Sequence, residues 1–555
     1  MFAIAIMLGN NYSFELEPYT AAPPRSRVKR FRRSSGPHSE TGFVDYKYPN
    51  LRALLQGSRC SRTTMLFSAA LAALAVLPAF VAGRQIPVVE GVLGGVATLP
   101  RKSGPQTLVA DASDASSKPT PGKLRVTENS GVCETTPGVY QASGYGDLTS
   151  DESVWFWFFE ARNNPDTAPL VTWFNGGPGS SSMIGLFQEN GPCRINNDSS
   201  SVSLNPNSWN EFANVLYIDQ PIGVGFSYGS TTTGTSEEAA SDVWKFLQIW
   251  FQDSRFSKFQ GRDFGIWTES YGGHYGPTFA AYFLQQNAAI TKGSVTGIPI
   301  NLKYLGVGDG LTDPLSQYPG YITYSQSNPY HPLVSSSVWS RANSSYYRSG
   351  GCESQIQACY NGGSNSVCSQ AQNFCNNNIL SPLAGNWDVY YVLAQNPDPY
   401  PPDLTNYLTS RAVTSKIGSQ STWQETNDDV YDNFADTGDW MRNSAPNLET
   451  VINSGVRTVV YDGDADFILN FNGVENMVNN LQTDFSSQFK QQQFANFTVN
   501  GQSAGVFKNA GTFSYVRFFG AGHEVPAYQW GTLSRGEAAL QMFTQIMSNQ
   551  SLTPT

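Results

Sequence analysis

The sequence predicts an α/β fold with a mostly parallel central sheet, helices on both faces and an inserted cap region. Short runs of β-branched and aromatic residues alternate with helical patterns, which is typical of a parallel sheet with helical crossovers. Several runs are almost continuously apolar, as expected for central strands that are covered on both faces. The runs that we expect to be strands are residues 154–161, 169–175, 214–221, 263–270, 302–310, 456–463 and 515–522.

Helical periodicity is clearest in residues 236–252, between two of these strands. The apolar residues there recur at the spacing of one helical face. They are Val243, Phe246, Leu247 and Trp250.

The alternation stops in residues 313–440, which are rich in Asn, Ser, Tyr and Pro, and it resumes near Val451. A long irregular stretch within a compact α/β domain is best explained as an insertion over one end of the sheet. We therefore assign residues 124–312 and 441–555 to the two parts of the core, and residues 313–440 to a cap.

Three segments precede the core. Residues 65–83 form an apolar run that ends in small residues, which predicts a signal peptide cleaved near Ala82 or Gly83. Accordingly, we expect Met65 to be the start and the basic residues 1–64 to be a gene-model extension; if Met1 is the start, the run could act as a signal anchor. Residues 84–123 are rich in Ser, Asp, Pro and Gly, a composition that cannot bury a core and predicts a propeptide or flexible leader.

The net charge of −10 is unevenly distributed, because residues 1–64 are basic and the remainder is acidic. An acidic body argues against a nucleic-acid partner, since such binding depends on clustered Lys and Arg. The signal-like run predicts a secreted or vacuolar protein with no stable membrane association, and its oligomeric state stays open. The sequons that would then accept glycans are Asn197, Asn343, Asn496 and Asn549.

Seven cysteines are present, and six lie downstream of the predicted signal peptide. Four of these cluster within residues 352–375, where nested pairing of Cys352–Cys375 around Cys359–Cys368 would staple one compact loop. Cys133–Cys193 is then left by elimination. Because no CxxC pair is present, we expect no zinc site, and the sequence indicates no other metal and no organic cofactor.

Ser270 is the candidate nucleophile. It follows an apolar strand and precedes a probable helix, as in a nucleophile elbow, with the small residue Gly272 two positions later. Thr268 replaces the usual leading glycine, so the bare GxSxG pattern is not met. The glycine-rich segment 173–179, at the end of another strand, offers backbone N–H groups for an oxyanion, and it lacks the Gly-Lys-Ser/Thr of a phosphate loop.

Among four histidines, His523 is the candidate base, because it follows an apolar strand in a loop near the C-terminus. The others are His38 in the leader, His274 on the helix after Ser270 and His331 in the insertion.

The acid should lie between the serine and the histidine in chain order. Asp462, Asp464 and Asp466 follow a predicted strand in this interval. A calcium site is the alternative, but EF-hand spacing and a closing Glu are missing. Physical reasoning alone leaves all three aspartates possible.

Together these strings resemble the serine carboxypeptidase family from about Gly131 to the C-terminus. The matching motifs are Trp173–Gly179, Asp219–Ser227, Glu269–Gly273, Gly308–Asp313, Gly463–Phe467 and Gly522–His523. The resemblance implies an α/β-hydrolase fold, and the cap and the nested cysteines fit the family. It also implies that Asp466 is the acid and that the N–H groups of Gly177 and Tyr271 hold the oxyanion.

The resemblance further implies how a free C-terminus is recognised. Asn175 would donate to the substrate carboxylate, which faces the paired carboxyls of Glu189 and Glu269, with Trp173 in the same network. Because these carboxyls and a substrate carboxylate cannot all be ionised together, we expect peptide binding to fade towards neutral pH. Asp309 stands where family members often have Asn.

The expected function is that of a serine carboxypeptidase that removes C-terminal residues from peptides and proteins at acidic pH, through an acyl-enzyme on Ser270. An acyltransferase on the same scaffold is the second hypothesis, since the acyl group could pass to an alcohol or amine. A catalytically silent binding protein is the third. A general lipase or esterase would lack the carboxylate-binding residues.

Overall fold

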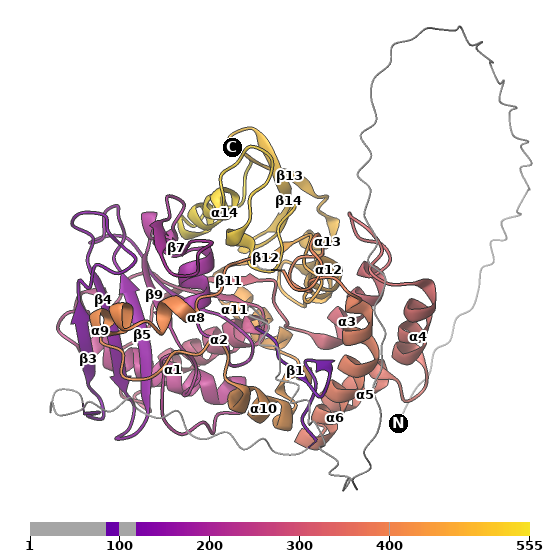
Figure 1. The fold of residues 1–555 in the computed structure, drawn as a ribbon, viewed down its shortest axis with the longest axis horizontal. Helices are drawn as coiled ribbons and strands as arrows, with labels where there is room; N and C mark the ends of the chain where they lie inside the picture. Colours follow the sequence, from indigo (N-terminus) through magenta and orange to yellow (C-terminus); the bar gives the residue numbers. More distant parts are fainter. Residues whose placement is uncertain (1–84, 99–117, 399) are drawn as a thin grey trace, which may run out of the picture. The chain divides into compact units, whose positions relative to one another are not determined.

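The structure is a computed structural model that describes residues 85–98, 118–398 and 400–555 (Figure 1). The predicted extension and signal peptide, residues 1–83, lie outside the described residues.

Within the described part of the chain, eleven strands form one sheet in the order β13-β14-β15-β12-β11-β10-β6-β9-β5-β4-β3. The six strands from β15 to β9 run parallel, whereas the strands at both ends are antiparallel. The parallel strands are β6 (Leu170–Phe174), β9 (Asn214–Ile218), β10 (Phe264–Glu269), β11 (Leu302–Gly308), β12 (Arg457–Gly463) and β15 (Phe513–Phe518). The others are β3 (Leu124–Glu128), β4 (Gln141–Asp147), β5 (Ser153–Phe159), β13 (Ala495–Val499) and β14 (Gln502–Ala510).

Both faces of the sheet are buried, which explains the continuously apolar strands. In β5, Phe156 and Phe158 belong to the hydrophobic core on one face, and Trp155 and Trp157 to the core on the other. This alternation follows from the two-residue period of a strand. The predicted α/β architecture is confirmed.

Helices supply the other half of each core. Packed on the Phe156 face are α1 (Ser236–Gln252), α2 (Gly272–Thr291), α11 (Ala445–Asn453) and α12 (Phe471–Asn480). On the Trp155 face lies α14 (Glu537–Met547). Helix α1 has the predicted bounds, and Thr235 caps it by accepting a hydrogen bond from the Glu238 N–H.

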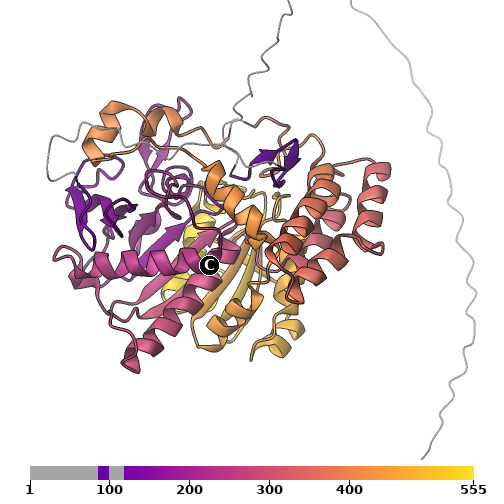
Figure 2. The same cartoon turned by 90° about the horizontal axis from the view of Figure 1, so that it is seen from below.

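The insertion between β11 and β12 is helical rather than irregular. It contains α3 (Pro314–Tyr324), α4 (Ser336–Tyr347), α5 (Cys352–Tyr360), α6 (Asn365–Cys375), α7 (Ser381–Ala384), α8 (Thr405–Leu408), α9 (Arg411–Ile417) and α10 (Asp428–Thr437). Many of the polar residues that suggest irregular chain are caps: Ser364 and Asn427 accept N–H bonds at the starts of α6 and α10. Figures 1 and 2 both show α3–α6 grouped on the side of the sheet opposite β3–β5.

Residues 85–98 are packed, although the composition of residues 84–123 predicts a loose leader. They form a small hairpin of β1 (Val88–Val89) and β2 (Val92–Leu93) beside the cap helices (Figure 2). Three apolar side chains, Ile86, Val89 and Leu93, are buried in the core of the Phe156 face. The cap also binds the hairpin backbone, since Asn376 Nδ2 donates to the Gly94 carbonyl at 2.6 Å. A preformed surface thus orders a segment that has no core of its own.

Among the described residues, no helix is both long enough and apolar enough to cross a membrane.

Candidate active site

Ser270 occupies a strained turn between β10 and α2. Its φ is +65°, in the left-handed region that few residues other than glycine adopt. Gly272 allows this turn, since a Cβ on it would lie 2.5 Å from Cβ of Thr268. The hydroxyl of Ser270 is buried and has no hydrogen-bond partner among the described residues. Local strain and a free hydroxyl are the two features expected of an elbow.

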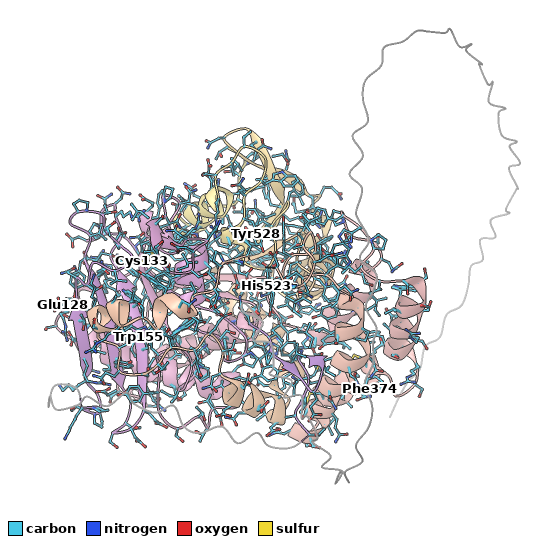
Figure 3. All side chains as sticks on the ribbon, viewed as in Figure 1. Glu128, Cys133, Trp155, Phe374, His523 and Tyr528 are labelled. Carbon is cyan, nitrogen blue, oxygen red and sulfur yellow. A yellow bond between two sulfur atoms is a disulfide. The ribbon has the colours of Figure 1, made fainter. Side chains whose placement is uncertain are left out.

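His523 and Asp466 lie at the same edge of the sheet as Ser270. Strands β10, β11, β12 and β15 are successive parallel neighbours, so the loops after them meet at their carboxyl ends. His523 Nδ1 lies 2.9 Å from Asp466 Oδ2, and both side chains are fully buried. The N–H groups of Ile468 and Leu469 donate to the same carboxylate at 2.9 and 3.1 Å. Figure 3 labels His523 near the middle of the view, and its side chain is fully buried.

The other predicted candidates have different partners. Tyr515 donates its hydroxyl to Asp462 at 2.6 Å, and the Gly520 N–H donates to Asp464 at 2.7 Å. His274 is hydrogen-bonded to two backbone carbonyls, and so is His331. Of the three aspartates left open by the sequence, only Asp466 is hydrogen-bonded to His523 among the described residues.

The pKa of His523 is raised above its ordinary value. Burial alone would lower the pKa, but the charge of Asp466 and the hydrogen bond to it, together with the charges of Glu524 and Glu189, raise the pKa by more. His523 Nε2 is buried and unpartnered within the described chain, like the Ser270 hydroxyl. No hydrogen bond joins these two atoms among the described residues, so a Ser270–His523 contact would have to form during catalysis.

The glycine-rich segment after β6 packs against the elbow. A Cβ on Gly176 would lie 2.2 Å from the backbone nitrogen of Tyr271, so only glycine fits there. Gly177 has a φ of +102°. No acceptor within the described residues takes the N–H of Gly177 or of Tyr271. Backbone N–H groups without an acceptor are what an oxyanion hole needs, so both stay candidates for that role.

The predicted carboxylate-binding residues form one buried network. Trp173 Nε1 donates to Asn175 Oδ1 at 2.7 Å, which fixes the amide with its nitrogen facing the carboxyls. Asn175 Nδ2 then donates to Glu189 at 3.3 Å and to Glu269 at 3.2 Å. Trp173, Asn175, Glu189 and Glu269 are all fully buried. Glu189 ends a π-helical turn, Gly185–Glu189, a rare conformation that is frequent at functional sites.

The two carboxyls in this network, those of Glu189 and Glu269, have pKa values raised above the ordinary value for glutamate. Burial raises the pKa of Glu269 well above its ordinary value, and the charge of Glu189 adds to the effect. Burial also raises the pKa of Glu189. The pair can therefore donate as well as accept, which suits recognition of a carboxylate.

Three residues at the site were missed by sequence reasoning or given no role. Glu524, next to His523, is buried, and burial raises its pKa to about 8. Gln85 Nε2 donates to Glu524 at 3.0 Å and to Glu269 at 3.4 Å. Asp309 contributes a carboxyl oxygen that lies within 4.8 Å of atoms of Asp466 and His523. The position of Glu524 beside the candidate base was the available signal; nothing local pointed to Gln85.

The three predicted cysteine pairs are joined in the structure, whereas glycosylation of the four sequons stays a prediction. The structure contains the disulfides Cys133–Cys193, Cys352–Cys375 and Cys359–Cys368. Asn197, Asn496 and Asn549 are exposed and Asn343 is partly exposed.

Fold and site together define an α/β-hydrolase with a serine at the elbow, a histidine–aspartate pair at the same sheet edge and a buried carboxyl cluster beside them. A family model described as serine carboxypeptidase matches residues 131–549. The chain belongs to this family and is a serine-type carboxypeptidase, a hydrolase.

Fungal proteins are among its relatives. Carboxypeptidase S1 of Penicillium janthinellum is 46% identical over 431 residues, which cover 77% of this chain and all of that protein. Carboxypeptidase Y of Schizosaccharomyces pombe is 34% identical over 76% of this chain and 42% of its own length. The solved structure of a prohormone-processing carboxypeptidase from Saccharomyces cerevisiae matches with a TM-score of 0.60 and 22% identity, over 80% of this chain and 94% of that one, and supports the fold.

Proposed function

We propose that the protein releases single amino acids from the C-termini of peptides and proteins at acidic pH, through an acyl-enzyme on Ser270. His523 Nε2 takes the Ser270 proton as the hydroxyl oxygen attacks the scissile carbonyl carbon. Asp466 orients the imidazole through Nδ1 and stabilises its protonated form. The N–H groups of Gly177 and Tyr271 hold the oxyanion.

Collapse of the tetrahedral intermediate breaks the C–N bond, and His523 gives its proton to the leaving amine. Water then attacks the acyl-Ser270 ester with the same base, which regenerates the hydroxyl.

The carboxyl cluster is the single observation that carries the proposal. A substrate carboxylate beside Glu189 and Glu269 is tolerated only while that pair retains a proton, and the pKa of both is raised. Asn175 can donate to the same carboxylate, because Trp173 fixes its orientation. An ester or acyl-sugar substrate offers no terminal carboxylate for such a cluster, which disfavours a general esterase or an acyltransferase. The buried pairing of His523 with Asp466 disfavours a silent binding protein.

The test compares an N-blocked dipeptide acid with its C-terminal amide, at about pH 4.5, near the ordinary pKa of glutamate. We expect preferential hydrolysis of the acid by the wild type and none by Ser270→Ala. Transfer of acyl groups between alcohols or amines without peptide hydrolysis would favour the acyltransferase hypothesis instead.

We also propose that residues 84–123 are a leader that restrains the enzyme. It precedes the family match, which begins at residue 131, and its described residues 85–98 reach into the site. The side-chain amide of Gln85 donates hydrogen bonds to Glu269 and Glu524. The backbone carbonyl of Gln85 accepts a hydrogen bond from Ser180 Oγ at 3.0 Å. The Ile86 N–H donates to the hydroxyl of Tyr390, whose ring lies 5.2 Å from that of His523. A peptide C-terminus would compete for the carboxyls that Gln85 occupies.

The secretory pathway is the proposed route, ending outside the cell or in a vacuole. The apolar run 65–83 and the three disulfides support this location. Peptides and proteins are the proposed substrates.

A further inference from the structure

Asp309 is a buried carboxyl at the centre of the active site. The catalytic steps proposed above give it no role. It follows β11 with a φ of +40°, and its N–H donates to the carbonyl of Tyr461 at 2.8 Å. One carboxyl oxygen, Oδ1, accepts from the Gly463 N–H at 3.0 Å. The other, Oδ2, is buried and accepts from no N–H among the described residues. This side chain, Asp466 and His523 each bring one atom within 4.8 Å of the others.

Two carboxyls this close, both fully buried, cannot both be ionised without a large cost, so they share one proton. The donors around each carboxyl decide which one is charged. Asp466 receives two N–H bonds and faces His523 Nδ1, whereas Asp309 receives one N–H bond. Donors stabilise the ionised form, so Asp466 is the carboxylate and Asp309 is the acid.

The surroundings of Asp309 support this distribution. Burial raises its pKa well above the ordinary value, and the charges of Asp466 and Asp462 raise it further. The titratable groups that interact with it are Asp466, Asp462 and Tyr461 from β12 and its loop, His523 after β15, Glu269 from β10 and Tyr324 from α3. Lys and Arg are absent from this described set.

We propose that Asp309 is a positioning residue: as a neutral acid it donates its O–H to the Asp466 carboxylate and so holds Asp466 against His523. The inference rests on the proposed function, since it assumes that His523 is the base. An asparagine at this position would make the same donation with its amide. Asp309 differs from asparagine in one respect, because an acid can lose the donated proton.

This difference makes the activity depend on pH on the alkaline side. While Asp309 is neutral, the Asp309–Asp466 pair carries one negative charge, balanced in the transition state by the protonated His523. When Asp309 ionises, the hydrogen bond to Asp466 is lost and two carboxylates repel each other. Asp466 is then held less well against His523. We therefore expect kcat to fall at alkaline pH in the wild type and to persist in Asp309→Asn.

The experiment measures two rates from about pH 4.5 to about pH 9: kcat for a blocked dipeptide, and the rate at which an organophosphonate labels Ser270. The labelling rate reports the serine–histidine reactivity without any need for a peptide, so it separates failure of this inference from failure of the proposed function. At about pH 4.5, near the ordinary pKa of a carboxyl, we expect Asp309→Asn to match the wild type within about threefold. Asp309→Ala, which removes the donor, should be roughly tenfold slower than the wild type at that pH, and the gap should close at alkaline pH, where the wild type also loses the donor.

Asp462→Asn is the matched control. Asp462 is also buried with a raised pKa, but its partner is the Tyr515 hydroxyl, so its substitution should retain an alkaline decline. The decline should move to lower pH, because the charge of Asp462 no longer raises the pKa of Asp309. Thermal unfolding of each variant shows whether it folds. Superimposable pH profiles for the wild type and Asp309→Asn would overturn the inference, as would equal rates for folded Asp309→Ala and the wild type at about pH 4.5.

Discussion

The contact between Gln85 and the carboxyl cluster predicts how strongly the leader restrains the enzyme. Gln85→Ala removes two side-chain hydrogen bonds, to Glu269 at 3.4 Å and to Glu524 at 3.0 Å. At about 1 kcal/mol each, their loss weakens the seated hairpin by about 2 kcal/mol. Because about 1.4 kcal/mol corresponds to a tenfold change in an equilibrium constant, the equilibrium between the seated and the released hairpin should shift about 30-fold towards release. If the hairpin must leave before substrate binds, the rate at low substrate should rise by up to the same factor.

The assay is the initial rate of dipeptide hydrolysis by the full chain, before and after trypsin cuts the leader at Arg101–Lys102. Val88→Ala serves as the control, because Val88 lies in the same hairpin with 40% of its surface exposed. We expect Gln85→Ala alone to be faster before the cut, and the difference to shrink after it. Equal rates for Gln85→Ala, Val88→Ala and the wild type, unchanged by the cut, would refute the reasoning.

Two further predictions concern pH. KM of the wild type should rise by up to about tenfold per pH unit once the Glu189–Glu269 pair ionises, whereas Glu269→Gln, which stays neutral, should flatten the dependence. Glu353→Gln, on exposed α5 surface, is the control, and a wild-type KM that stays constant from about pH 4 to about pH 8 would contradict the prediction. Stability should also fall as pH rises. Burial raises the folded-state pKa of Glu425 to about 7 and of Glu524 to about 8. Such groups stabilise the fold below their ordinary pKa and lose that contribution as pH rises through the raised value, by up to about 1.4 kcal/mol per pH unit each. Thermal unfolding between about pH 5 and about pH 8 measures this, and a midpoint that increases over that range would exclude it.

Much of the core could be predicted because its signals are local. Apolar runs such as residues 263–270 contain strands, here β10, and the helix at residues 236–252 has its predicted bounds. In contrast, β4 (Gln141–Asp147) was not predicted, since its Gln-Ala-Ser-Gly-Tyr-Gly-Asp sequence has low strand propensity. It is a strand because β3 and β5 supply hydrogen bonds on both sides.

Site residues could be predicted only where the sequence immediately next to them has a recognisable pattern. Ser270 and His523 follow apolar strands, so their place at the sheet edge could be inferred. Which aspartate meets His523, and the proximity of Asp309, depend on how β11, β12 and β15 align, which no local pattern encodes. The contacts of Gln85 join residues 184 and 439 positions apart, beyond any periodicity.

The most direct test of the central claim is hydrolysis of the N-blocked dipeptide acid and its amide by the trypsin-cut enzyme at about pH 4.5, close to the ordinary pKa of glutamate. We predict release of the terminal residue from the acid, slower action on the amide and no activity in Ser270→Ala. Equal hydrolysis of acid and amide, or undiminished activity in Ser270→Ala, would contradict the assignment of a serine carboxypeptidase that recognises a free C-terminus.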